Sequence, residues 1–392
     1  MKDETKIVHA GRDGAAHFGA VNTPVYHAST ILFPTLAALE AAPRTRIRYG
    51  RRGTPTLFAL EDAIAALEGG AGAAVLPSGL AAAGLALLAC LKAGDHVLIT
   101  DSVYDPVRDF ADRVLTTLGI EVQYYDPLIG AGIKGLMRAN TRAVYCESPG
   151  SLTLEVQDLP AIAAAAHEGG AHAGGASVIA DNTWGTPLLL KPLRLGADIV
   201  VHSATKYIGG HSDLMLGVLV ANESTVRKVK QTAGLFGQTA GPDDVFMALR
   251  GLRTLKARLD RHSASARRVA AWLATRPEVA RVLDPALPSF PGHALWRRDF
   301  AGASGLFSVL LAGDWKKPAL AAMLDGMQLF KMGYSWGGFE SLILPVDVGK
   351  HRSATRWSSP GQLLRLSIGL EDPDELIADL AAGFARLTEA RT

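Results

Sequence analysis

The stretch "VVHSATKYIGGHSD" (residues 200–213) places one lysine, Lys206, directly after an apolar run that is typical of a buried β-strand. Two hydroxyl residues, Ser203 and Thr205, stand beside it. A lysine ammonium is costly to remove from water unless it is paired or chemically employed. The stretch therefore predicts a core strand that ends at a lysine with a partner or a task.

Short apolar runs alternate with helix-length segments on both sides of this lysine. The runs are "AAVLPSG" (73–79), "DHVLIT" (95–100), "EVQYYD" (121–126), "AVYCESPG" (143–150), "SVIADNTW" (177–184), "DIVVHSATKY" (198–207) and "LMLGVLVAN" (214–222). This alternation predicts an α/β fold with a mostly parallel central sheet and helices on both faces. Ligands bind such sheets at the carboxyl ends of the strands, so we expect the site there.

The chain divides into an arm and two domains. Residues 1–56 contain no long periodic helix and end in the basic run "RTRIRYGRRGTPT" (44–56), which favours an N-terminal arm. Residues 57–252 form the predicted α/β domain and begin with an amphipathic helix over 57–68. Residues 253–392 form a predicted smaller α+β domain.

The second half of the chain has its own predicted elements. A long helical pattern over 242–274 connects the two domains. In the smaller domain we expect strands at 304–311, 327–333, 341–345 and 363–370, and a terminal helix over 373–387. The Gly/Ala-rich segment "HEGGAHAGGASV" (167–178) is interpreted as a flexible connection.

Composition limits the class of partner. The 392 residues carry 40 Lys and Arg against 38 Asp and Glu, a net charge of +2, so no large field favours nucleic acid or an anionic membrane. The only two cysteines, Cys90 and Cys146, lie in apolar stretches, and no metal site is expected from them. The start of the chain lacks the apolar core of a signal peptide, and no run of about 18 apolar residues occurs. These features predict a cytoplasmic protein whose partners are small molecules or copies of itself.

Asp181 and Lys206 each follow an apolar strand and invite two interpretations. A structural ion pair is the simpler one. The alternative is pyridoxal 5'-phosphate, which needs a lysine amine for a Schiff base, an acid for its ring nitrogen and donors for its phosphate. The residues alone leave both interpretations open.

Further residues at strand ends supply the other needs of that cofactor. The backbone N–H groups of Gly79 and Leu80 lie where a helix begins, a position suited to phosphate, although such a motif is often only a helix cap. Ser203 and Thr205 can donate to the same phosphate or serve as turn residues. Tyr104, on the loop after another strand, can stack on a cofactor ring or simply pack.

Taken together, the motifs resemble one enzyme family along nearly the whole chain. They are "GAVNTPVYHAST", "YGRRGTPT", "PSGLAA", "ESPGSLTLEVQDLPAIA", "ADNTW", "SATKYIGGHSD", "YSWGGFESLILP" and "LLRLSIGLEDPDELIADLAAGF". The combination is similar to the Cys/Met-metabolism family of pyridoxal-phosphate enzymes, and most of all to its cystathionine β-lyases. The resemblance implies a fold-type I, aminotransferase-like architecture, usually a homotetramer whose active sites lie at dimer interfaces.

The resemblance also implies roles for individual residues. Lys206 matches the Schiff-base lysine, Asp181 the partner of the pyridine nitrogen, and Tyr104 the ring-stacking tyrosine that also takes part in proton transfer. The phosphate-binding positions are matched by Gly79, Leu80, Ser203 and Thr205, and the substrate carboxylate is expected at Arg365. Tyr49 and Arg51 match residues that reach the cofactor phosphate of a neighbouring subunit, which makes residues 1–56 an oligomerisation segment, and Tyr49 is also expected near substrate.

The segment "GYSWGGFES" (333–341) bears on the reaction. Ser335 is expected to contact the residues that orient the lysine, whereas Tyr334 and Trp336 place two rings where substrate lies. The γ-acting members commonly carry an acid at the position of Tyr334, so the rings resemble the β-lyases. The expected reaction is α,β-elimination of L-cystathionine, with L-cystine or cysteine S-conjugates as further substrates, to a thiol, pyruvate and ammonia. A γ-lyase or γ-synthase is the alternative.

Two departures from the family pattern qualify this expectation. Gly234 stands where some β-lyases carry an aromatic residue, so the preferred shape of substrate can differ. The Gly/Ala-rich insertion at 169–176 is unusual too, and its distance in sequence from the motifs indicates a surface feature.

Overall fold

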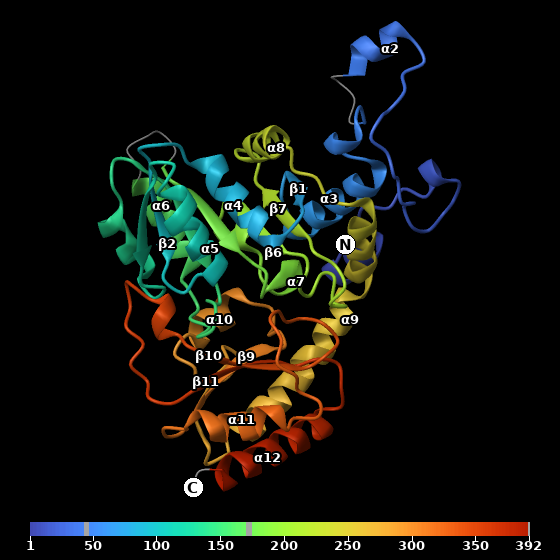
Figure 1. Ribbon diagram of the computed structural model, residues 1–392. Coiled ribbons are helices and arrows are strands. Elements are labelled where there is room, and N and C mark those ends of the chain that lie inside the picture. The colour runs from blue at the N-terminus through green and yellow to red at the C-terminus, as the bar shows by residue number, and fades with distance from the viewer. Residues whose placement is uncertain (43–46, 170–174, 391–392) are drawn as a thin grey trace.

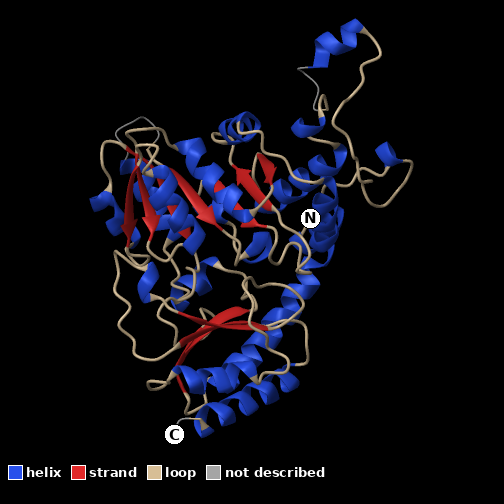
Figure 2. Cartoon of the chain, viewed as in Figure 1, coloured by secondary structure: helices blue, strands red, loops and turns tan. Residues whose placement is uncertain are grey.

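A computed structural model describes residues 1–42, 47–169 and 175–390 (Figure 1). Within these residues the chain forms two sheets, one in each half, with helices packed around them (Figure 2). The N-terminus lies in the middle of the view, beside the larger sheet, and the C-terminus lies at its lower end, beyond the smaller sheet. This confirms the predicted α/β class with a separate second sheet.

The larger sheet has the strand order β1-β7-β6-β5-β4-β2-β3 among the described residues. Pairs from β6 to β3 are parallel, and β7 alone runs antiparallel to both of its neighbours. The strands are β1 (Gly72–Leu76), β2 (His96–Thr100), β3 (Glu121–Tyr125), β4 (Thr141–Glu147), β5 (Ser177–Asp181), β6 (Ile199–Ser203) and β7 (Gly217–Ala221). Each lies inside one of the seven apolar runs or overlaps it, because buried parallel strands need apolar residues on both faces.

Helices cover both faces of the larger sheet. One face packs on α4 (Gly79–Cys90), α5 (Asp105–Phe110) and α8 (Val226–Leu235). The opposite face packs on α1 (Asp3–His9), α3 (Pro55–Glu68), α7 (Thr186–Leu189) and the first half of α9 (Pro242–Leu273) at one end, and on α6 (Leu159–Gly169) at the other. The predicted helices at 57–68 and 242–274 correspond to α3 and α9.

The smaller sheet has the order β10-β11-β9-β8 and is antiparallel. Its strands are β8 (Val279–Leu283), β9 (Leu306–Leu311), β10 (Leu342–Val346) and β11 (Leu363–Ser367), and the helices of this half are α10 (His293–Asp299), α11 (Lys317–Asp325) and α12 (Pro373–Glu389). Helix α9 runs from the larger half to the smaller one (Figure 1), so the predicted boundary at residue 252 falls inside it.

One strand prediction was wrong and one strand was missed. The run 327–333 forms only a single bridge, between Lys331 and Leu342, instead of a strand. The carboxylate of Asp379, on α12, accepts hydrogen bonds from the backbone N–H groups of residues 328, 329 and 330, so these groups are not available to a sheet. The missed strand is β8, whose exposed Arg281 interrupts the apolar pattern.

The part of the N-terminal segment that follows α1 and carries α2 reaches away from the body of the protein (Figure 1). It carries the short helix α2 (Leu36–Ala41) and exposes large apolar side chains, among them Phe18, Leu32 and Leu36. The part of the basic run at residues 43–46 lies outside the described residues, as does most of the Gly/Ala-rich insertion at 169–176. In the described part of the chain, no helix is both long and apolar enough to span a bilayer.

Candidate active site

A cavity of about 450 Å³ opens at the carboxyl ends of the parallel strands. All the predicted site residues except Tyr49 and Arg51 line it. The lining residues among them are Gly79, Leu80, Tyr104, Asp181, Ser203, Thr205, Lys206, Tyr334, Ser335, Trp336 and Arg365. We call it the active-site cavity. These residues come from segments up to 286 positions apart, between Gly79 and Arg365, and the strand order of the larger sheet together with the packing of the smaller domain brings them together.

The register of the strands explains why Glu147, Asp181 and the hydroxyl residue Ser203 are neighbours in this cavity. Glu147, the last residue of β4, pairs with Asp181, the last residue of β5. Ser203 ends β6 opposite Gly217 of β7. Because parallel strands all end at one edge, the side chains that follow them converge on the same space.

Lys206 enters the cavity from the loop after β6 and is largely buried. Its Nζ donates a hydrogen bond to Oγ of Ser335, at 2.6 Å, and lies 5.4 Å from the ring centre of Trp336. Burial, assisted by the positive charge of Arg365 and opposed by Asp181, lowers the pKa of Lys206 to about 8. Roughly one such amine in ten is therefore uncharged and nucleophilic at pH 7, and about half are at pH 8.

Asp181 is half-buried in the wall of the cavity, and fixed dipoles hold it in place. The N–H of Thr183 donates to its Oδ1 at 2.9 Å, and the hydroxyl of Tyr145 lies 3.4 Å from its Oδ2. Burial raises the pKa of Asp181, while the bonds from Thr183 and the nearby His202 oppose that rise. Such a carboxylate is well placed to pair with a buried cation, which a protonated ring nitrogen supplies.

Glu147 is a second half-buried acid of the cavity and was not among the site residues predicted from the sequence. Burial and the neighbouring Asp181 raise its pKa, which favours the protonated form. Its Oε2 accepts a hydrogen bond from the backbone N–H of Tyr104 at 2.7 Å. Glu147 thus fixes the loop of Tyr104. Its position at the end of a predicted strand is the sequence signal that could have identified it.

The beginning of α4 forms a cradle for an anion. Ser78 caps the helix by accepting from the N–H of Ala81. Within the described residues, the N–H groups of Gly79 and Leu80 have no acceptor, and both residues line the cavity. A Cβ added at Gly79 would lie 2.6 Å from the side chain of Ser203, so only glycine lets the helix and the serine approach this closely.

Thr205 and Tyr104 complete the cofactor side of the cavity. The hydroxyl of Thr205 is held by Leu216, to whose carbonyl it donates at 3.3 Å and from whose N–H it accepts at 3.0 Å. The side chain of Tyr104 stays partly exposed at the cavity, 44% for the whole residue. Burial and Glu147 raise the pKa of the Tyr104 phenol, with Arg365 opposing, so its hydroxyl is protonated at neutral pH.

The smaller domain supplies the opposite wall. Arg365 of β11 donates to the carbonyl of Ser335 at 3.1 Å, and burial lowers the pKa of this guanidinium without discharging it. Ser335 adopts φ 98°, a left-handed conformation rare for a residue with a side chain, and so turns its hydroxyl toward Lys206. Trp336 packs against Tyr207, whereas Tyr334 is 94% exposed at the rim.

Tyr49 and Arg51 do not line the active-site cavity of their own chain. Arg51 donates instead to the carbonyl of Gly234 at 3.1 Å, beside a second, basic cavity of about 280 Å³. Gly234 also belongs to that second cavity, where an added Cβ would lie 2.3 Å from Nη1 of Arg52. Within one chain, Gly234 therefore does not shape the space around Lys206.

The fold and the cavity together define a class of protein. A buried lysine of lowered pKa, a fixed carboxylate and a helix N-terminus with unpaired donors fit pyridoxal 5'-phosphate, and an arginine nearby fits the carboxylate of an amino acid. The chain belongs to the Cys/Met metabolism PLP-dependent enzymes, whose family profile matches residues 4–385.

Individual relatives agree with that placement. The chain is 46% identical to the cystathionine beta-lyase of Salmonella typhimurium over 391 residues, 98% of each protein. It is also 46% identical to the cystathionine beta-lyase of Escherichia coli over 393 residues, 98% of this chain and 99% of that protein. Among solved structures, a cystathionine gamma synthase of Xanthomonas oryzae, in complex with aminoacrylate and cysteine, superposes with a TM-score of 0.91 at 34% identity over 100% of both chains.

Proposed function

We propose that this protein is a carbon–sulfur lyase that eliminates homocysteine from L-cystathionine and releases pyruvate and ammonia. The observation that carries the choice of reaction is the aromatic pair Tyr334 and Trp336 at the cavity. Among the described lining residues the only carboxylates are Asp181 and Glu147, which lie together at the ends of β5 and β4. No acid stands at position 334, where the family's γ-acting members commonly carry one. The β-lyase names of the relatives at 46% identity support the same choice.

Pyridoxal 5'-phosphate, when bound, supplies an electron sink for the bonds at Cα of the amino acid. In our proposal Gly79, Leu80, Ser203 and Thr205 hold its phosphate, and Asp181 pairs with its ring nitrogen. The features that support these roles are the N–H groups at the start of α4, which have no acceptor among the described residues, and the half-buried carboxylate.

Lys206 acts as the base that removes the proton from Cα. Its lowered pKa makes the free amine available near neutral pH, and the bond to Ser335 directs Nζ into the cavity. Arg365 binds the substrate carboxylate through N–H groups other than the one given to Ser335, which presents the Cα–H bond to Lys206.

Tyr104 assists the departure of sulfur. Because the raised pKa keeps its phenol protonated, the hydroxyl can donate a proton to the leaving thiolate after Lys206 has taken the Cα proton. The same ring lies on the cavity wall where it can stack on the cofactor. Water then hydrolyses the three-carbon product to pyruvate and ammonia, so that one cystathionine and one water give homocysteine, pyruvate and ammonia.

A panel of thioether and disulfide amino acids tests the reaction and its breadth. The holoenzyme is incubated with L-cystathionine, L-cystine and S-alkyl cysteines, and each keto acid is identified by chromatography. Pyruvate is the expected keto acid throughout. A predominance of 2-oxobutyrate from cystathionine would favour the alternative, a γ-acting enzyme. Lys206→Ala is expected to abolish covalent retention of the cofactor after borohydride reduction, and an unchanged adduct would assign the wrong lysine.

We further propose a cytoplasmic homotetramer with active sites shared between subunits. The supporting observations are two free, buried cysteines, the exposed apolar arm, and the position of Tyr49 and Arg51 outside their own cavity. Mixing Lys206→Ala with Arg51→Ala chains tests the sharing, because a mixed dimer would contain one intact site. Activity that stays at the level of the separate variants after subunit exchange would contradict it. Light scattering then measures the mass of the assembly.

A further inference from the structure

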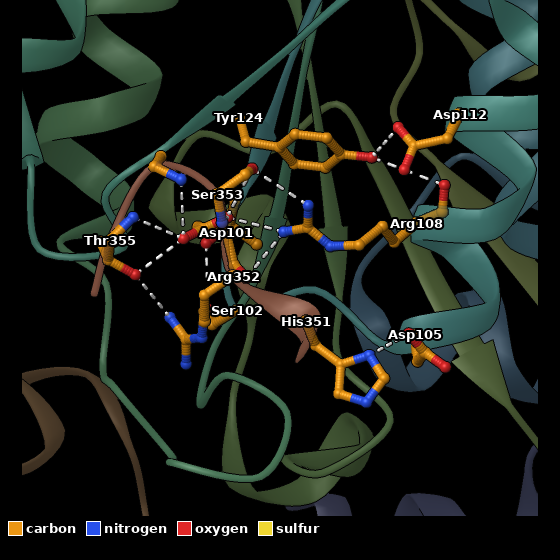
Figure 3. Close-up of polar contacts among 12 residues, drawn as sticks. Asp101, Ser102, Asp105, Arg108, Asp112, Tyr124, His351, Arg352, Ser353 and Thr355 are labelled. Carbon is orange, nitrogen blue, oxygen red and sulfur yellow. Dashed lines mark hydrogen bonds and ion pairs between the residues drawn. The ribbon is translucent and has the colours of Figure 1, made fainter. Parts of the chain in front are cut away.

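The connection between β10 and β11 reaches from the smaller domain to the larger one. Its residues 351–355, which we call the strap, surround the carboxylate of Asp101, whose side chain is fully buried (Figure 3). The backbone N–H groups of Ser353, Ala354 and Thr355 donate to that carboxylate at 2.9, 3.1 and 2.7 Å. The hydroxyl of Thr355 adds a bond at 2.7 Å. A carboxylate that accepts this many bonds fixes the conformation of the segment that donates them.

Arg108 ties the same carboxylate to helix α5. Its Nη2 donates to Oδ1 of Asp101 at 2.7 Å, and its Nη1 donates to the hydroxyl of Ser353 at 3.2 Å. The guanidinium lies 3.6 Å from the ring centre of Tyr124, whose hydroxyl donates to Asp112 of the same helical segment at 2.6 Å (Figure 3). The charge of Asp101 is therefore balanced by one buried arginine that also contacts the strap.

Two more strap residues contact the larger domain independently. Arg352, with a side chain only 6% exposed, donates to Oε1 of Glu155 at 3.0 Å and also bonds Thr153. His351 pairs with Asp105, in the first turn of α5, at 2.5 Å. The strap thus holds two separate segments of the larger domain.

Both segments form one wall of the active-site cavity. Asp101 lies three residues before Tyr104, and Tyr104, Pro106 and Val107 line the cavity. The segment from 149 to 152, together with Leu154, lines it too, and the N–H of residue 151 donates to the carbonyl of residue 102 at 2.8 Å. Eight residues after the strap, the chain enters β11, which carries Arg365.

We propose that Asp101 is a positioning residue that locks the wall carrying Tyr104 against the domain carrying Arg365. The inference rests on the proposed function, since it assigns Tyr104 and Arg365 to cofactor and substrate. The strap sets the distance between these two groups, so substrate held by Arg365 meets a fixed cofactor ring. A shift of about 1 Å between such groups can lower a rate on the order of a hundredfold.

Asp101 and Arg352 each join the strap to the larger domain, and we call them the two anchors. The variants Asp101→Ala and Arg352→Ala remove the two anchors separately. Asp95→Ala is the matched control, because Asp95 is a buried carboxylate at the other end of the same strand, and its partners in the described part of the chain are local groups and Arg142. Asp101→Asn keeps one acceptor for the strap and is expected to recover part of the loss. Each variant is assayed as holoenzyme, with kcat and KM, the visible circular dichroism of the bound cofactor, and the thermal midpoint.

We expect kcat/KM for pyruvate formation to fall at least about tenfold in both anchor variants, with a changed cofactor signal. The Asp95 variant is expected to keep both. Equal effects in Asp95→Ala and Asp101→Ala at matched thermal midpoints, or an unchanged cofactor signal in both anchor variants, would overturn the proposal. The circular dichroism of the bound cofactor is measured without substrate, so it tests the role of Asp101 even if the proposed reaction is wrong. A wild-type enzyme that formed no pyruvate would contradict the proposed function alone.

Discussion

The lowered pKa of Lys206 leads to a quantitative prediction for the apoenzyme. A lysine of ordinary pKa, 10.5, is uncharged in only about 0.3% of molecules at pH 8, whereas a pKa of about 8 leaves about half of the amines free. We therefore expect Lys206 to react with an amine reagent on the order of a hundredfold faster at pH 8 than an ordinary lysine of equal nucleophilicity. The physical cause is burial, followed by the positive charge of Arg365.

Competitive acetylation measures this pKa directly. The apoenzyme receives trace acetic anhydride between pH 6 and 11 with a lysine amide as internal standard, and mass spectrometry reports the Lys206 peptide. The expected midpoint is near pH 8, and Arg365→Leu is expected to move it upward, because a positive neighbour is lost. Arg261→Leu, whose guanidinium is exposed and bonds the Glu371 carbonyl, is the control and should leave the midpoint in place. A wild-type midpoint near 10.5 would refute the argument from burial.

Two further predictions concern the phosphate cradle and acid stability. Gly79→Ala should weaken cofactor binding about tenfold or more, because the new Cβ would lie 2.6 Å from the side chain of Ser203. The control variant Gly135→Ala, which has open space around the new Cβ, should bind the cofactor as the wild type does. Equilibrium dialysis measures the affinity of both variants for the cofactor. Burial opposes the charge of Asp101, but hydrogen bonds from the strap and Arg108 outweigh it and lower the pKa of this carboxyl to about 2 from 3.8. The charge therefore contributes about 2 kcal/mol to the free energy of unfolding. That contribution is present above pH 4 and is lost as the pH falls toward 2. The difference in unfolding free energy between wild type and Asp101→Asn should therefore shrink between pH 5 and 2.5, and a constant difference would contradict this assignment.

The strands of the larger sheet could be predicted because burial on both faces leaves little choice of residue. The strands ending at Asp181 and Ser203 have apolar centres, residues 178–180 and 199–201, and their polar side chains lie where the strands meet the cavity. The run 327–333 is also largely apolar but is not a strand, because the carboxylate of Asp379, about 50 residues later, accepts hydrogen bonds from its backbone N–H groups. Local composition carries no information about such a distant acceptor.

Site residues that stand in a recognisable motif could be predicted from the sequence, whereas residues whose importance lies only in their contacts could not. Lys206 and Asp181 stand in motifs, and the strand order places them in one cavity. Glu147 and Asp101 are acids at strand ends too, yet their importance lies in what donates to them, Tyr104 in one case and the strap in the other. The strap is 250 residues from Asp101 in the chain, and its sequence shows no pattern that indicates the contact.

The fate of labelled cystathionine tests the central claim most directly. L-Cystathionine carrying ¹³C only in its three-carbon half is incubated with the holoenzyme, and the products are identified by mass spectrometry. Cleavage between Cβ and sulfur, which Lys206, Tyr104 and Arg365 are proposed to carry out, predicts labelled pyruvate and unlabelled homocysteine. Labelled cysteine with unlabelled 2-oxobutyrate would contradict the account.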